Sequence, residues 1–279
     1  MRRAIGLAMP NHRTIVAFTI LIAGTLAWSA CVPASAEAEY SKCNASPEAF
    51  VIRRAMLPRN FINADKWGFD FNADGRLDNA LGNAAVSLAQ FAQDFSPEMH
   101  MHERLQDGAW RLIVYRCADL TRARIELRSS FGQQSVLATA IGNSLQSDPD
   151  TTEVALPLSW FADALGTTDD GGWLMSHRAS LHLRREGDNL TGRFAVALDP
   201  FEARAALLVP LADFFTYTPS AKLARQALDI NRDGVVTANE LASSGSFQQL
   251  TAADLPSGVP GVHQATVSLG ISIEATRVP

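Results

Sequence analysis

The sequence predicts an α+β protein in which an antiparallel, sandwich-like β region lies between loop–helix segments. Polar and apolar residues alternate between Gly108 and Phe215 and again from Val267 to Ile273, which is the period of half-buried strands. Apolar residues take helical spacing between Leu77 and Phe95, and residues 40–70 show no clear period. The predicted division is therefore an N-terminal segment with a loop and a helix, an antiparallel β domain, a helix–loop–helix and a last strand, at residues 37–104, 105–216, 217–252 and 253–279.

Residues 1–36 have the composition of an export signal. Three arginines precede an apolar run at residues 14–28, and Ala34-Ser35-Ala36 has the small-x-small pattern that signal peptidase cuts. The run is shorter than the roughly 20 residues of a membrane-spanning helix. We therefore expect a secreted or periplasmic protein. In an alternative interpretation Cys31, which follows two small residues, is lipidated and anchors the protein to a membrane.

Charge and cysteine content agree with an exported protein. Residues 1–36 contain three Arg and no acidic residue, so their removal changes the formal net charge from −5 to −8. An acidic protein is a poor partner for nucleic acid or anionic lipid, and neither is predicted as a partner. Cys43 and Cys117 remain, and in an oxidising compartment we expect them to form one disulfide. Two separate buried thiols are the alternative.

Residues 229–240 carry oxygen-bearing side chains at the spacing of a calcium-binding loop. Ca²⁺ takes about six to eight oxygen ligands in a tolerant geometry. Gly234 allows a sharp bend with positive φ, and Val235 offers its backbone carbonyl. The predicted ligands, at loop positions 1, 3, 5, 7, 9 and 12, are Asp229, Asn231, Asp233, Val235, Thr237 and Glu240.

This segment resembles the EF-hand superfamily over residues 218–250. Apolar stripes precede and follow the loop, as in the two helices of that motif, and the flanking segments are therefore expected to be EF-hand-type loop–helix elements. The resemblance implies Ca²⁺ as the bound ion. A surface turn rich in Asp, Asn and Gly is the alternative interpretation.

A second, partial loop spans residues 70–81. Its twelfth position is Leu81, so the bidentate acid is missing, and residues 67–69 before it do not look helical. The loop resembles the looser calcium loops of dockerin-like and thrombospondin-type modules, with Asp65 available to complete the ligand shell. A helix N-terminus stabilised by acidic residues is the alternative. The predicted ligands are Asp70, Asn72, Asp74, Arg76 and Asp78.

EF-hand loops usually pair through their eighth positions, which here are Leu77 and Val236. If these two residues met, the β domain would be inserted between the halves of one calcium module. This pairing is a hypothesis that the positions of the two loops test.

Other motifs are weaker. His100 and His102 alternate within residues 98–103 and could bind a transition metal, although a solvated loop explains them equally well. His177 and His182 lie in the β region without an evident acidic partner. The chain has no nucleophile elbow, P-loop or dinucleotide fingerprint, so we do not predict an enzyme.

These observations predict an exported protein in which calcium has a structural role. One alternative is a cell-surface adhesion or interaction module whose β domain contacts a protein or surface partner while calcium acts as a brace. The other is a secreted hydrolase with a pocket beside His177 or His182.

Overall fold

The computed structural model describes residues 42–43, 46–92, 110–129, 132–147, 155–157, 173–257 and 265–279. The expected export signal, Cys31 and the histidine pair of residues 98–103 lie outside the described residues.

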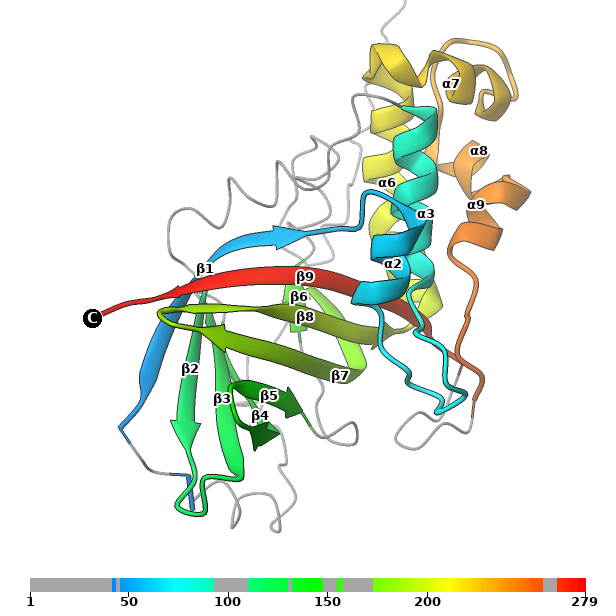
Figure 1. Cartoon of the computed structure of the whole chain (residues 1–279). Coiled ribbons are helices and arrows are strands. Elements are labelled where there is room, and N and C mark those ends of the chain that lie inside the picture. The colour runs from blue at the N-terminus through cyan, green and yellow to red at the C-terminus, as the bar shows by residue number, and fades with distance from the viewer. Residues whose placement is uncertain are drawn as a thin grey trace, which may run out of the picture.

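The described strands form one antiparallel sheet that closes into an eight-stranded barrel (Figure 1). The ring runs in the order β5-β4-β3-β2-β1-β9-β8-β7, and a pairing between β5 and β7 closes it. A short strand, β6, pairs with β7 outside the ring. The strands are β1 (Glu48–Met56), β2 (Arg111–Arg116), β3 (Arg122–Ser129), β4 (Gly132–Ile141), β5 (Ser144–Ser147), β6 (Ala155–Pro157), β7 (Trp173–Glu186), β8 (Asn189–Leu198) and β9 (Val267–Arg277).

The predicted fold class, an α+β protein with a β-sandwich, is therefore wrong. A sandwich needs two sheets that face each other, whereas here each of the eight strands has a hydrogen-bonded neighbour on both sides. Alternation of polar and apolar residues is the same in both architectures, because both have one buried and one outward face. The pairings that decide between them join β1 to β9 and β5 to β7, which are distant in sequence.

Strand β1 lies in the region that was predicted to be irregular. Its pairing with β9 shifts register between Ile52 and Arg54, which is a β-bulge or a similar irregularity. Phe50 and Ile52 are buried in the main core before the shift, and Ala55 is buried there after it. The shift changes the period of two, so the alternation that reveals a strand in sequence is interrupted.

Inward-facing residues of all eight strands belong to one apolar core, which fills the barrel. Burial of a large aliphatic or aromatic side chain contributes about 1.5–3 kcal/mol, so this core dominates the stability of the barrel. Its fully buried large residues from the strands are Phe50, Leu112, Ile125, Leu145, Leu183, Leu190 and Leu198.

The helices gather on one side of the barrel (Figure 1). The longest, α6, was not predicted, since the β domain was expected to continue to residue 216. The chain leaves the sheet at Asp199, whose side chain accepts hydrogen bonds from the N–H groups of Phe201 and Glu202 and so caps the helix. Pro200 occupies its first turn. The helices are α2 (Phe61–Trp67), α3 (Ala80–Phe91), α6 (Pro200–Tyr217), the 3-10 turn η1 (Pro219–Ala221), α7 (Lys222–Leu228), α8 (Ala238–Ser243) and α9 (Gly245–Leu250).

One buried amide joins α2 and α3 to the barrel. Asn79, which is 2% exposed, donates hydrogen bonds to the carbonyls of Ala64 and Gly270 and accepts them from the N–H groups of Gly82 and Gly270. Helix α2 and strand β9 approach closely there. A Cβ atom on residue 270 would lie 2.3 Å from the carbonyl oxygen of Trp67, which is too close for a real side chain. Glycine at position 270 therefore allows α2 to pack directly against β9.

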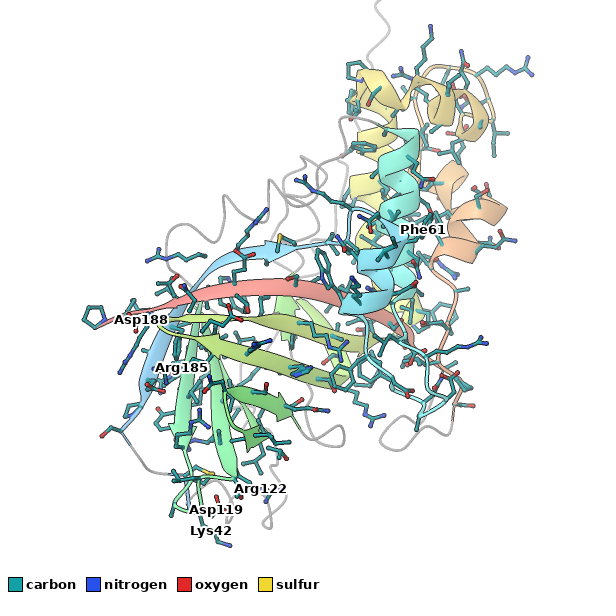
Figure 2. The ribbon with its side chains drawn as sticks, in the orientation of Figure 1. Lys42, Phe61, Asp119, Arg122, Arg185 and Asp188 are labelled. Carbon is teal, nitrogen blue, oxygen red and sulfur yellow. A yellow bond between two sulfur atoms is a disulfide. The ribbon has the colours of Figure 1, made fainter. Side chains whose placement is uncertain are left out.

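Cys43 and Cys117 form a disulfide, which confirms that prediction. It ties the segment before β1 to the residue that follows β2. The backbone N–H of Ala118 also donates to the carbonyl of Lys42. Figure 2 shows Lys42, Asp119 and Arg122 together at this end of the barrel. The disulfide therefore fixes the N-terminal end of the described chain to the β2–β3 turn.

Candidate metal centre

The loop of residues 229–240, hereafter loop II, connects α7 to α8 at the upper right of Figure 1. Arg232 and Gly234 have positive φ angles of 62° and 89°. These left-handed conformations turn the backbone twice within three residues, and glycine adopts such a conformation without steric cost. The N–H groups that follow therefore point toward the side chains at the start of the loop.

Loop II is held by hydrogen bonds from its own backbone to its first three oxygen-bearing side chains. Asp229 accepts from the N–H groups of Asp233 at 3.1 Å and Gly234 at 2.8 Å, one on each carboxylate oxygen. Asn231 Oδ1 accepts from Asp233 N–H at 2.9 Å. Asp233 Oδ1 accepts from Val235 N–H at 2.8 Å. Three of the predicted ligands thus lie on the concave side of one turn.

The loop of residues 70–81, hereafter loop I, repeats this pattern bond for bond. Ala73 and Gly75 have φ angles of 59° and 85° at the positions of Arg232 and Gly234. The four corresponding hydrogen bonds, accepted by Asp70, Asn72 and Asp74, measure 3.1, 2.9, 2.9 and 2.8 Å. Two segments far apart in sequence therefore adopt the same turn with the same side chains.

The acidic residue that closes each loop comes from a different position. Glu240 Oε1 accepts from the N–H groups of Ile230 and Asn231, and its Oε2 accepts from the N–H and hydroxyl of Thr237. The Thr237 and Asn231 N–H groups hold the pKa of Glu240 below its ordinary value. In loop I, Asp78 at the ninth position accepts from Phe71 N–H at 2.9 Å. Phe71 and Ile230 are both second-position residues, so Asp78 occupies the place that Glu240 takes in loop II.

Loop I packs against the outer face of the barrel. Phe69 and Phe71 are buried against Ala195 and Ala197 on the outward face of β8, together with Leu255. This apolar contact fixes the start of loop I on the barrel.

Two arginines of the barrel, Arg178 of β7 and Arg193 of β8, also form hydrogen bonds to residues at the start of loop I and just before it. Arg178 donates to the carbonyl of Phe71 at 2.7 Å, and Arg193 donates to the carbonyl of Lys66 at 2.9 Å. The guanidinium of Arg193 also lies 5.1 Å from the centre of the Phe69 ring, within cation–π range. Of residues 67–69, which were not expected to be helical, only Trp67 belongs to a helix, as the last residue of α2; Gly68 and Phe69 lie outside it.

Asp254 is the acidic neighbour of loop I that the sequence did not identify. Its carboxylate accepts hydrogen bonds from the N–H and hydroxyl of Ser268, and its charge acts on Asp78. Asp65, which was expected to supply an additional carboxylate, is exposed on α2. No sequence motif identifies Asp254, because this residue reaches loop I only when β9 packs against α3.

Burial raises the pKa of Asp78 to about 6, and the neighbouring charges of Asp254, Asp74 and Asp70 add to this effect. The folded protein therefore holds the Asp78 proton more tightly than the unfolded chain. The resulting stabilisation is complete below pH 3.8, the ordinary pKa of aspartate, and is lost as the pH rises through 6. In metal-free protein, the free energy of unfolding should therefore decrease between pH 3.8 and about 6, and this decrease should be smaller in Asp78→Asn.

Urea unfolding in the presence of EDTA across this pH range measures that slope. Asp188→Asn is the control, because Asp188 lies on the exposed β7–β8 hairpin far from loop I (Figure 2). Equal slopes in wild type and Asp78→Asn would contradict the assignment.

The two loops do not pair, so that hypothesis is wrong. They lie at opposite ends of the helical side of the molecule, loop I at the lower right and loop II at the upper right of Figure 1. Leu77 is 38% exposed, whereas Val236 is 2% exposed and exchanges backbone hydrogen bonds with the side chain of Thr216. Each loop is therefore a separate unit.

In the part of the chain that the structure describes, His, Cys, Asp and Glu side chains do not form a group of three or more that could hold a metal ion. In loop II the carboxylates of Asp229 and Glu240 face backbone N–H groups. His182 lies on β7, where burial and the charge of Arg193 lower its pKa.

Across the described residues, no helix has the length and apolar character needed to cross a membrane. No family model, no curated protein and no solved structure matches the chain.

Proposed function

We propose that this chain is an exported calcium-binding protein and that Ca²⁺ orders loop II and the helices on either side of it. The observation that carries the proposal is the repetition of one turn in loops I and II, with the same four hydrogen bonds and the same two positive-φ positions. Thr237 and Glu240 supply the ninth- and twelfth-position oxygens of loop II, and they also form the capping box at the start of α8.

The donor set of loop II fits a hard cation. Its side chains and the Val235 carbonyl offer only oxygen atoms, which Ca²⁺ prefers, and no thiolate or imidazole, which transition metals prefer. Asp229 and Glu240 accept hydrogen bonds from backbone N–H groups of loop II. A bound Ca²⁺ would be held by the carboxylates of Asp229, Asp233 and Glu240 and would offset their mutual repulsion. Ordering of the loop is thereby linked to calcium concentration.

The disulfide supports an oxidising location, because such bonds are rare in reducing compartments. We propose a secreted or periplasmic protein, with lipid attachment at Cys31 as the alternative. An affinity of order 10⁻⁴–10⁻³ M is sufficient for a structural site outside the cytoplasm.

Glu240→Gln tests the proposal. The substitution removes the charge and bidentate character of the twelfth ligand, so calcium should no longer protect loop II. Hydrogen exchange of the amides of residues 229–247, with calcium and with EDTA, reads this loop separately from loop I. Wild type at a calcium concentration of 100 Kd should gain about 2.7 kcal/mol of protection from binding, and the variant almost none.

Glu186→Gln is the matched control, since Glu186 is an exposed acid at the end of β7 and forms an ion pair with Arg184. It should retain the full effect of calcium. Equal calcium protection of loop II in Glu240→Gln and wild type would exclude loop II as the site.

Loop I is a second candidate site on the same observation, with Asp78 closing the loop. Calorimetric titration should then find two calcium ions per wild-type chain, one in Glu240→Gln and none when Asp70→Asn is added. Retention of one site in the double variant would exclude loop I.

A further inference from the structure

Val236 lies between two proposed ligands of loop II, the Val235 carbonyl and Thr237. Its backbone N–H donates to Thr216 Oγ1 at 2.8 Å, and its carbonyl accepts from the same hydroxyl at 3.3 Å. Val236 and Thr216 are 2% and 6% exposed, so water is largely excluded from these bonds. One hydroxyl therefore satisfies both backbone groups at the point where the loop passes between its seventh and ninth positions.

Thr216 is itself firmly held. It is the penultimate residue of α6, next to the buried Phe214 and Phe215 of the main core. Its backbone carbonyl accepts a hydrogen bond from Arg225 of α7, the helix that leads into loop II. Leu241, just after the loop, is 1% exposed and belongs to the same core. Thr216 thus connects α6 to the entering helix and to the middle of the loop.

We infer that Thr216 is the positioning residue of loop II and that it replaces the partner loop with which a calcium loop of this type would otherwise pair. By holding both backbone groups of Val236, it sets the direction of the Val235 carbonyl and the place of Thr237 before the ion binds. This inference rests on the proposed calcium function of loop II. It explains how a solitary loop is ordered without a second loop beside it.

Thr216→Val keeps the branched shape of the side chain and removes the hydroxyl. The loop must then be ordered when calcium binds, and the Val236 N–H and carbonyl lose their partner. A loss of one to two ordinary hydrogen bonds corresponds to a roughly tenfold weaker calcium affinity at loop II. Thr216→Ser restores the hydroxyl and should return the affinity to within about threefold of wild type. The measurement is calcium titration followed by hydrogen exchange of residues 229–240.

Thr251→Val is the matched control. Thr251 is 2% exposed, and its hydroxyl also makes two hydrogen bonds, to the Phe247 carbonyl and from Arg204, away from loop II. This variant should lose stability as Thr216→Val does while its calcium affinity stays at the wild-type value. Equal affinities in wild type and Thr216→Val would overturn the inference and leave the calcium function standing. Weakening of the same size in Thr251→Val would also overturn it, because the effect would then be one of general stability.

A measurement on wild type covers the case in which Thr216→Val does not fold. The Val236 amide should exchange slowly in EDTA, and calcium should change its rate less than those of its neighbours in loop II. Fast exchange of this amide in EDTA would overturn the inference. Absence of any calcium effect on loop II in wild type would instead refute the proposed function.

Discussion

Replacing Asn79 with alanine is expected to lower the free energy of unfolding by about 4 kcal/mol, because it breaks a buried hydrogen-bond network. The Asn79 amide makes four hydrogen bonds to backbone groups of α2, α3 and β9. Alanine would remove these bonds in a site where the native side chain is 2% exposed, and, among the described residues, only the Ala64 carbonyl would keep another donor, the N–H of Gly68. Each unsatisfied buried group costs about 1–3 kcal/mol, and partial entry of water offsets some of this cost.

Chemical denaturation of wild type and variant measures the difference. Asn83→Ala is the control, because Asn83 lies one turn further along α3 and is half-buried. Its loss should stay below about 1 kcal/mol, as for most substitutions away from a buried network. Hydrogen exchange should also show that the Gly270 amide loses protection in Asn79→Ala. A loss below about 1 kcal/mol in Asn79→Ala would show that the amide does not join the helices to the barrel.

Removing the Cys43–Cys117 disulfide is expected to lower the free energy of unfolding by a similar amount, about 4 kcal/mol, because the unfolded chain gains conformational entropy. The bond spans 74 residues of sequence, and the chain entropy that a loop of this length removes from the unfolded chain corresponds to that figure. The double variant Cys43→Ser, Cys117→Ser should therefore unfold at lower denaturant concentration than oxidised wild type. Reductant should lower the midpoint of wild type to that of the variant.

The double variant also provides the control for reductant. Added reductant should leave its midpoint unchanged, since both thiols are absent. A wild-type midpoint that does not move on reduction would contradict a stabilising role for the bond. The comparison requires metal-free buffer, so that any calcium effect on loops I and II stays constant.

The two loops differ in how they are attached to the rest of the molecule. Phe69 and Phe71, at the start of loop I, are buried on the barrel wall, and Asn79 within it is hydrogen-bonded to β9, so the barrel supports the conformation of this loop. Loop II contacts the core through Val236, and its other residues are exposed or half-buried. A ligand that orders exposed segments therefore has its largest effect on loop II. This difference is why hydrogen exchange, which reads each segment separately, suits the experiments better than a single melting temperature.

The sequence by itself determined the local features of this protein. Strand alternation from β2 to β8, the positions of the loop side chains and the two cysteines are properties of residues close together in the chain, and they could be identified without coordinates. The glycine at position 234 is one such feature, since its φ of 89° is a conformation that glycine adopts without strain.

Only the tertiary structure decided how these parts are assembled. Barrel closure depends on hydrogen bonds between β1 and β9 and between β5 and β7, and alternation within a strand does not specify its neighbours. The separation of the two loops, the approach of Asp254 to Asp78 and the contact of Thr216 with Val236 depend in the same way on packing between distant segments. A pattern of side chains specifies which face is buried, whereas the partner that buries it is selected by the whole chain.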